Sequence, residues 1–189
     1  MKTFIISLKV FLILTIITGV IYPLSITLIG NIAFPDRSKG SLIVKDGKII
    51  GSELIGQKFD STIYFHSRPS AIDYQPMPSG GSNLGPTSLT LQHRMDSLAN
   101  AYIEYNGLQK NTAVPPDAIT ASGSGIDPHI SFENAILQMN RISKARGFDE
   151  TKKNKLTELV KKTTEDPQLG FLGDTRVNVL KLNLELDKL

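Results

Sequence analysis

The 189-residue sequence contains no cysteine and no tryptophan. Without cysteine there can be no disulfide framework, no thiolate metal site and no cysteine nucleophile. The sequence also lacks a G-x-x-x-x-G-K-[ST] phosphate loop, a G-x-S-x-G nucleophile elbow and an Asp-Lys-Thr-Gly phosphorylation motif. Its three histidines, His66, His93 and His129, do not have the spacing of a zinc site.

Net charge is small outside the N-terminus. Lys2 and Lys9 are two of the 21 basic residues and precede a long uncharged segment, so the remaining chain nearly balances its 18 acidic residues. A nucleic-acid-binding protein usually has a strongly basic face, so this balance argues against that class.

No charged residue occurs from Val10 to Pro35. About 20 apolar residues span a hydrocarbon core, and no A-x-A-like cleavage site follows this run. The sequence therefore predicts an uncleaved transmembrane helix over residues 10–34, the alternative being a buried helix of a soluble protein. The basic tail, residues 1–9, favours a cytoplasmic N-terminus, which places residues 35–189 outside the cytoplasm.

Small and polar residues recur along this predicted helix. Thr15, Gly19, Tyr22 and Ser25 follow helical spacing. Because helices associate in lipid through close packing at small residues and through polar contacts, this face predicts a docking surface. The alternative is a passive anchor. Pro23 lacks a backbone donor and predicts a kink.

The first part of the remaining chain has strand and loop signals. Asp46-Gly47 between two β-branched runs predicts a hairpin over Ser41–Gly51, and Thr62–His66 predicts a further strand. Residues 67–87 are rich in proline and glycine and predict a long loop.

Helical periodicity dominates the later part. We expect helices from Thr87 or Ser88 to Gly107, from the cap Ser131 to Gly147, and near Glu150–Thr164. Arg176–Leu189 fits a short strand leading into a helix. Early strands followed by helices predict a single extracytoplasmic α+β domain after the membrane helix.

Three groups of residues are candidates for a site. Ser124, Asp127 and His129 resemble a nucleophile set but lie too close in sequence for a triad, which usually assembles from distant segments. The loop of Ser79, Gly80, Gly81, Ser82 and Asn83 suits either anion binding or contact with a partner chain. We expect this loop and the Thr120–Asp127 turn to form one partner-facing or core-bracing surface, across which Arg68 bonds to carbonyls or a carboxylate.

Several blocks of this sequence resemble the C subunit of potassium-transporting P-type ATPases, the KdpC family. The blocks occur in the same order along nearly the whole chain and are Ile17–Leu24, Gly51–Gln57, Tyr64–Ala71, Ser79–Leu84, Thr120–Asp127, Lys144–Gly147, Val177–Leu180, Leu182–Leu184 and Leu186–Asp187.

The resemblance implies an accessory, non-catalytic subunit of a high-affinity, ATP-driven potassium uptake pump in the bacterial inner membrane. It implies two partners, a channel-like potassium-binding subunit and a P-type ATP-hydrolysing subunit, whose assembly the chain stabilises. The resemblance further implies that the complex handles potassium and ATP. This subunit would assist nucleotide binding or ion entry, and it would have no cofactor of its own. The alternatives from the residues alone are a membrane-anchored extracytoplasmic hydrolase and a ligand-binding domain.

Overall fold

The computed structural model describes residues 1–189 and confirms the α+β class. Its contacts divide the chain into two units, Met1–Ser52, called here the anchor unit, and Glu53–Leu189, called the body.

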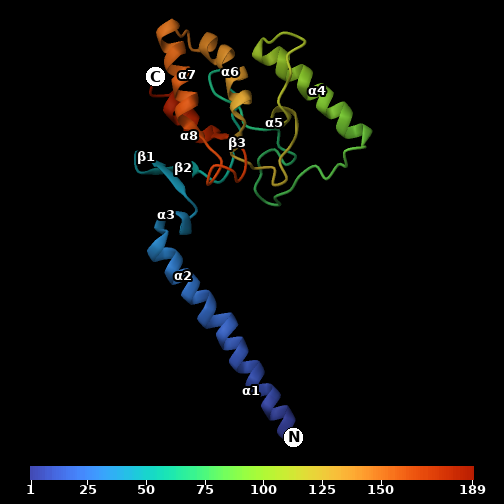
Figure 1. The fold of residues 1–189 in the computed structure, drawn as a ribbon, viewed down its shortest axis with the longest axis vertical. Helices are drawn as coiled ribbons and strands as arrows, with labels where there is room; N and C mark the ends of the chain where they lie inside the picture. The colour runs from blue at the N-terminus through green and yellow to red at the C-terminus, as the bar shows by residue number, and fades with distance from the viewer. The chain divides into compact units, whose positions relative to one another are not determined.

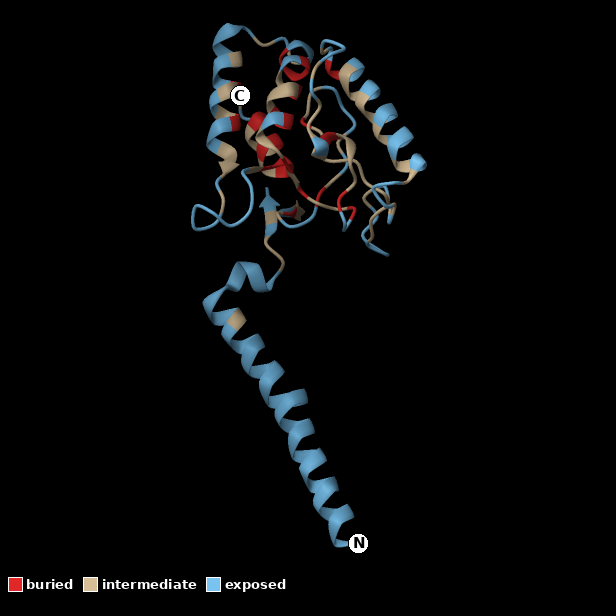
Figure 2. Ribbon diagram, turned by 45° about the vertical axis from the view of Figure 1, so that its right-hand side comes forward, coloured by how far each residue is buried: buried red, intermediate tan, exposed pale blue.

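The anchor unit begins with one long apolar helical stretch, Lys2–Ala33, long enough to cross a membrane. It consists of α1 (Lys2–Ile16), a π-helical turn η1 (Ile17–Ile21) and α2 (Tyr22–Ala33). Figure 2 shows this stretch exposed along nearly its whole length. The helix begins at Lys2 rather than at Val10, so the basic N-terminal residues are also helical.

The π turn lies immediately before Pro23. In it the Tyr22 N–H donates to the Ile17 carbonyl, five residues back, where an α-helix would pair residues four apart. π turns and prolines are both recognised causes of helix bending, so the expected kink now rests on two neighbouring features.

A short helix, α3 (Pro35–Ser38), and a β-hairpin complete the anchor unit. The hairpin pairs β1 (Leu42–Lys45) with β2 (Lys48–Ser52) in antiparallel register. Asp46 and Gly47 both have left-handed φ angles, 52° and 74°. A type I′ turn requires this geometry, so the predicted hairpin is confirmed.

The body has a small antiparallel sheet in the order β3-β5-β4, formed by β3 (His129–Ile130), β5 (Arg176–Asn178) and β4 (Thr164–Glu165). Its helices are α4 (Leu89–Asn106), α5 (Pro116–Ile119), α6 (Phe132–Ala145), α7 (Glu150–Thr163) and α8 (Val179–Leu186). Figure 1 shows α6 between α7 on one side and α4 on the other.

Local capping explains where these helices begin and end. Ser88 and Ser131 accept hydrogen bonds from Leu91 N and Asn134 N, and Gly107 ends α4 with a φ of 64°. Each of these caps was expected from the sequence. The final segment also forms the predicted short strand followed by a helix.

One hydrophobic core fills the body around α6, α7, α8 and the sheet, as the buried residues in Figure 2 show. Its fully buried members are Phe65, Ile130, Ala135, Ile142, Leu156, Val160, Val177, Val179, Leu182 and Leu186. α6 and α7 each contribute apolar residues to this core.

The strand predicted over Thr62–His66 is wrong. The backbone N–H and C=O of Phe65 pair with the side-chain amide of Asn183, at 2.8 and 2.9 Å. Gln138 pairs with the His66 N–H and C=O in the same way, at 2.7 and 3.2 Å. Residues 62–64 form a turn and a bend, and the Tyr64 N–H donates to the Ser61 carbonyl at 3.2 Å. Side-chain amides from α8 and α6 pair with the backbone that follows, so the segment joins no sheet.

Candidate functional site

The long loop over residues 67–87, which the structure confirms, meets the turn before β3 through an ion pair. Arg68 Nη1 lies 3.0 Å from Asp127 Oδ2, and each side chain is only about a quarter exposed. The other carboxylate oxygen accepts the His129 backbone N–H at 2.9 Å and faces His129 Nδ1 at 3.4 Å. Arg68 therefore binds a carboxylate across this surface, as expected from the sequence.

The electrostatics of this pair favour the charged carboxylate. Burial opposes ionisation of Asp127, but hydrogen bonds from His129 and the charge of Arg68 outweigh it and lower the pKa of Asp127. The Arg68 Nε atom is buried and has no hydrogen-bond partner within the protein. The Arg68 carbonyl in turn accepts the Tyr74 hydroxyl, and burial raises the pKa of that phenol to about 12.

Hydrogen bonds to backbone carbonyls join the loop to the turn. Ser79 Oγ and Gly80 N–H both donate to the Ser124 carbonyl, at 2.9 and 3.1 Å. On the other side, Ser70 Oγ donates to the Gly125 carbonyl at 2.7 Å. The structure thus brings together the two segments that the sequence analysis placed on one surface.

Glycine is required at two points around the turn before β3. Gly125 has a φ of 73°, and a Cβ there would lie 2.7 Å from the Gly80 carbonyl oxygen and 2.6 Å from Ile72 Cγ1. A Cβ on Gly56 would lie 2.5 Å from the Asp127 carbonyl oxygen. At both positions the backbone passes too close to a neighbouring segment for a side chain to fit.

The rest of the Ser79–Asn83 loop is half-buried to exposed. A Cβ on Gly81 would approach the Gly123 carbonyl oxygen at 3.3 Å, so this glycine is also near the turn. Ser82 is half-buried, whereas Asn83 is exposed and has a left-handed φ of 52°, which asparagine tolerates better than most residues.

The structure gives Ser124, Asp127 and His129 local bonding roles. The Ser124 hydroxyl accepts the Ile126 N–H at 3.2 Å, and His129 faces Asp127. No group of three or more histidine or acidic side chains is placed to share a metal ion. The arrangement therefore bonds neighbouring segments to one another.

A polar hollow of about 430 Å³ opens beside the ion pair. Arg68, Asp127 and His129 form one part of its wall, and Asp117, Ser131 and Arg176 are among the residues of the rest. Basic and acidic groups alternate around it, so it suits polar contacts of mixed sign rather than a single strongly charged ligand.

Sequence reasoning missed Asp117, which organises one side of this hollow. Its carboxylate accepts hydrogen bonds from the Ser131 N–H, the Ser131 hydroxyl and the Asn134 side chain, each at 2.8 Å. These contacts fix the start of α6. In the sequence, the only signal near Asp117 is the preceding Pro115-Pro116. That pattern indicates a turn but does not predict which groups the Asp117 carboxylate binds.

The predicted face of the membrane helix is changed by the π turn. Gly19 lies within it, and a Cβ there would meet nothing within 4 Å. Because a π turn holds more residues than an α turn, Tyr22 and Ser25 are offset from the side that carries Thr15. The Ser25 hydroxyl donates to the Ile21 carbonyl at 2.7 Å, which uses its proton within the helix.

Comparison with known proteins identifies the family. Residues 4–188 match the family model described as "KdpC: K+-transporting ATPase, c chain". The chain belongs to the KdpC family. It is 47% identical over 181 residues to the potassium-transporting ATPase KdpC subunit of Cereibacter sphaeroides (strain ATCC 17029), covering 96% of this chain and 94% of that protein. It is 44% identical over 185 residues to the protein of the same name from Mycobacterium tuberculosis (strain H37Rv), covering 97% and 96%.

KdpC is the accessory subunit of the potassium-transporting ATPase. The match spans the membrane helix, the hairpin and the whole body, so it includes every segment of the surface described above. The similarity supports the subunit interpretation and gives no support to the hydrolase or ligand-binding alternatives.

Proposed function

We propose that this chain is the non-catalytic subunit that stabilises an ATP-driven potassium uptake pump. Its partners are a channel-like potassium-binding subunit and a P-type ATP-hydrolysing subunit. The observation that carries this proposal is the similarity to potassium-transporting ATPase KdpC subunits over nearly the full length of both chains. The complex handles potassium and ATP, and this subunit needs no cofactor of its own.

The proposed division of labour agrees with the architecture. The chain has one helix able to cross a membrane, and a single helix cannot enclose an ion pathway. The sequence also lacks a phosphorylation motif. Both the ion pathway and ATP hydrolysis therefore require other subunits. The membrane helix and the surface around the Arg68–Asp127 ion pair suit binding to those subunits.

The proposed location is the bacterial inner membrane, with the N-terminus in the cytoplasm and the body outside. Lys2 and Lys9 before the apolar stretch favour this orientation. Alkaline phosphatase and a reporter active only in the cytoplasm are fused after Leu189 in turn. We expect activity from alkaline phosphatase alone, and activity from the cytoplasmic reporter alone would reverse the orientation.

Affinity purification of the tagged chain from the membranes of its native cells tests the subunit assignment. We expect two large membrane proteins to co-purify, one of which hydrolyses ATP. Recovery of the chain alone, under detergent conditions that preserve other membrane complexes, would favour a solitary membrane-anchored domain instead.

A further inference from the structure

A tight turn between β4 and β5 carries three exposed apolar side chains. Leu169 is 83% exposed, Phe171 is 74% exposed and Leu172 is 49% exposed. Single exposed apolar residues are common on protein surfaces, but a contiguous apolar patch usually marks a binding surface. We call residues 168–172 the apolar turn.

The apolar turn is closed by its own backbone. The Gln168 N–H donates to the Leu172 carbonyl and the Leu172 N–H donates to the Gln168 carbonyl, both at 2.9 Å. Leu169 and Gly170 have left-handed φ angles of 55° and 81°. Leucine is disfavoured in this conformation by about 1 kcal/mol, so the fold holds a strained residue with its side chain in solvent.

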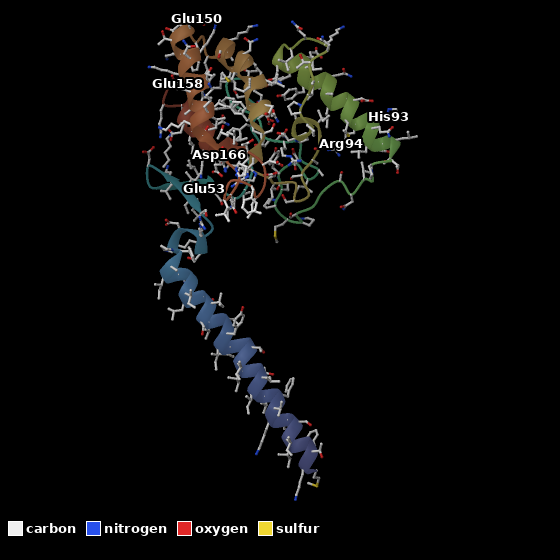
Figure 3. All side chains as sticks on the ribbon, in the orientation of Figure 1. Glu53, His93, Arg94, Glu150, Glu158 and Asp166 are labelled. Atoms are coloured by element: carbon white, nitrogen blue, oxygen red, sulfur yellow. The ribbon has the colours of Figure 1, made fainter.

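The turn lies beside the point where the chain enters the body. Lys181 Nζ lies 2.9 Å from Glu53 Oε2 and 3.8 Å from Glu165 Oε1, and Glu165 pairs with Arg176 at 3.0 Å. Glu53 is therefore held next to the two strands from which the apolar turn projects. Figure 3 shows Glu53 and Asp166 toward one end of the body, with Glu150 at the other end of α7.

The connection from the membrane helix to this point is short. Within the anchor unit, Ser52 Oγ donates to the Gly40 carbonyl at 2.7 Å, so the end of the hairpin returns to its beginning. The stretch that separates Ala33 from this contact is Phe34–Gly40, about seven residues, which reach at most ~25 Å when extended. α3 shortens that reach further. Because Glu53 follows Ser52 directly, this short connection joins the start of the body to the membrane helix.

We propose that the apolar turn inserts into the lipid interface of the membrane that holds α1 and α2. Leu169, Phe171 and Leu172 would contact acyl chains, and Phe171 has the aromatic character common at such interfaces. The turn suits lipid because the backbone hydrogen bonds that close it are internal, and lipid offers no replacement for them. Asp166 and Asp174 flank it and stay in water, which limits insertion to the tip.

This insertion gives the body a second attachment to the membrane. One tether alone leaves a domain free to rotate, whereas a tether and an inserted turn together restrict its tilt. The partner-facing surface would then be presented in a preferred orientation before the other subunits bind.

A single-tryptophan variant tests the insertion directly. The chain has no tryptophan, so Phe171→Trp provides one reporter in the full-length protein. The chain is reconstituted without other subunits in phosphatidylcholine vesicles, with and without lipid brominated near carbons 6 and 7. We expect a blue-shifted emission and about twofold quenching or more by the brominated lipid.

Leu89→Trp is the matched control, because Leu89 is 69% exposed and lies at the start of α4. Its emission should stay at long wavelength and unquenched. In the Phe171→Trp background, Leu169→Ser with Leu172→Ser should reduce the quenching, and circular dichroism checks that the body remains folded.

Equal, weak quenching of the two tryptophans would overturn the proposal. So would a Phe171→Trp emission that shifts only when the large subunits are added, because the turn would then bind protein. The measurement uses the chain alone in vesicles, so its outcome does not depend on whether the pump assignment holds.

Discussion

Replacing Gly125 with alanine should destabilise the body far more than the same change at Gly80. Both glycines lie where the 67–87 loop meets the turn before β3, and the Gly80 carbonyl contacts Gly125 directly. Gly125 has a φ of 73°, and a Cβ would lie 2.7 Å from the Gly80 carbonyl oxygen. A Cβ on Gly80 would meet nothing within 4 Å.

The expected magnitude follows from these two features. A left-handed conformation costs alanine about 1–2 kcal/mol. Overpacking against a backbone oxygen and Ile72 costs a further ~1–3 kcal/mol. The total of roughly 2–5 kcal/mol corresponds to a loss of roughly 6–15 °C in melting temperature for a domain of this size. Gly80→Ala should change the free energy of unfolding by no more than about 0.5 kcal/mol.

Thermal melting of the full-length chain in detergent, followed by circular dichroism, measures the difference. The membrane helix is common to both variants, so the change in transition temperature reports on the body. If Gly125→Ala melted within a degree or two of Gly80→Ala, the close approach of the two segments described here would be incorrect.

Three further outcomes follow from other residues. Arg68→Lys keeps the charge but loses the planar fork, so it should weaken co-purification with the pump or the potassium-stimulated activity of the pump. Ser124→Ala should leave both nearly intact. Loss of function in a stably assembled Ser124→Ala complex would revive the hydrolase alternative. Burial, aided by the nearby Arg141 charge, lowers the pKa of His66. As the pH falls, the unfolded chain therefore protonates His66 before the folded chain does. The contribution of neutral His66 to stability is complete above about pH 6.5 and is lost as the pH falls through the lower folded pKa. His66→Gln should flatten the profile of melting temperature against pH in that range, and an unchanged profile would refute the lowered pKa. Gly19→Leu should leave membrane insertion intact but weaken assembly by about 1–2 kcal/mol, and unchanged co-purification at limiting subunit concentration would make the helix a passive anchor.

Features encoded by neighbouring residues were predictable from the sequence. The Asp46-Gly47 turn specifies its hairpin through its own backbone preferences, and Ser131 caps α6 through an atom three residues away. The long apolar run likewise needs no tertiary contact to indicate a membrane helix. These elements were correct because their causes lie within a few residues of one another.

The features that failed or were missed depend on distant partners. Thr62–His66 has the composition of a strand, but Asn183 and Gln138 supply the hydrogen bonds that a strand would have given. Asp117 fixes the start of α6 from another segment. Local sequence patterns do not indicate hydrogen bonds between such distant segments. The Arg68 contact was foreseen only as a bond to some carbonyl or carboxylate, and the structure identifies Asp127.

Reconstitution of the pump with and without this chain tests the central claim most directly. The two large subunits and the chain are purified separately, and potassium-stimulated ATP hydrolysis is measured for each alone and for their mixtures. We expect no hydrolysis by the chain alone, and stable assembly and full activity of the large subunits only when the chain is added. Hydrolysis by the chain alone, or equally stable and active large subunits without it, would contradict the account.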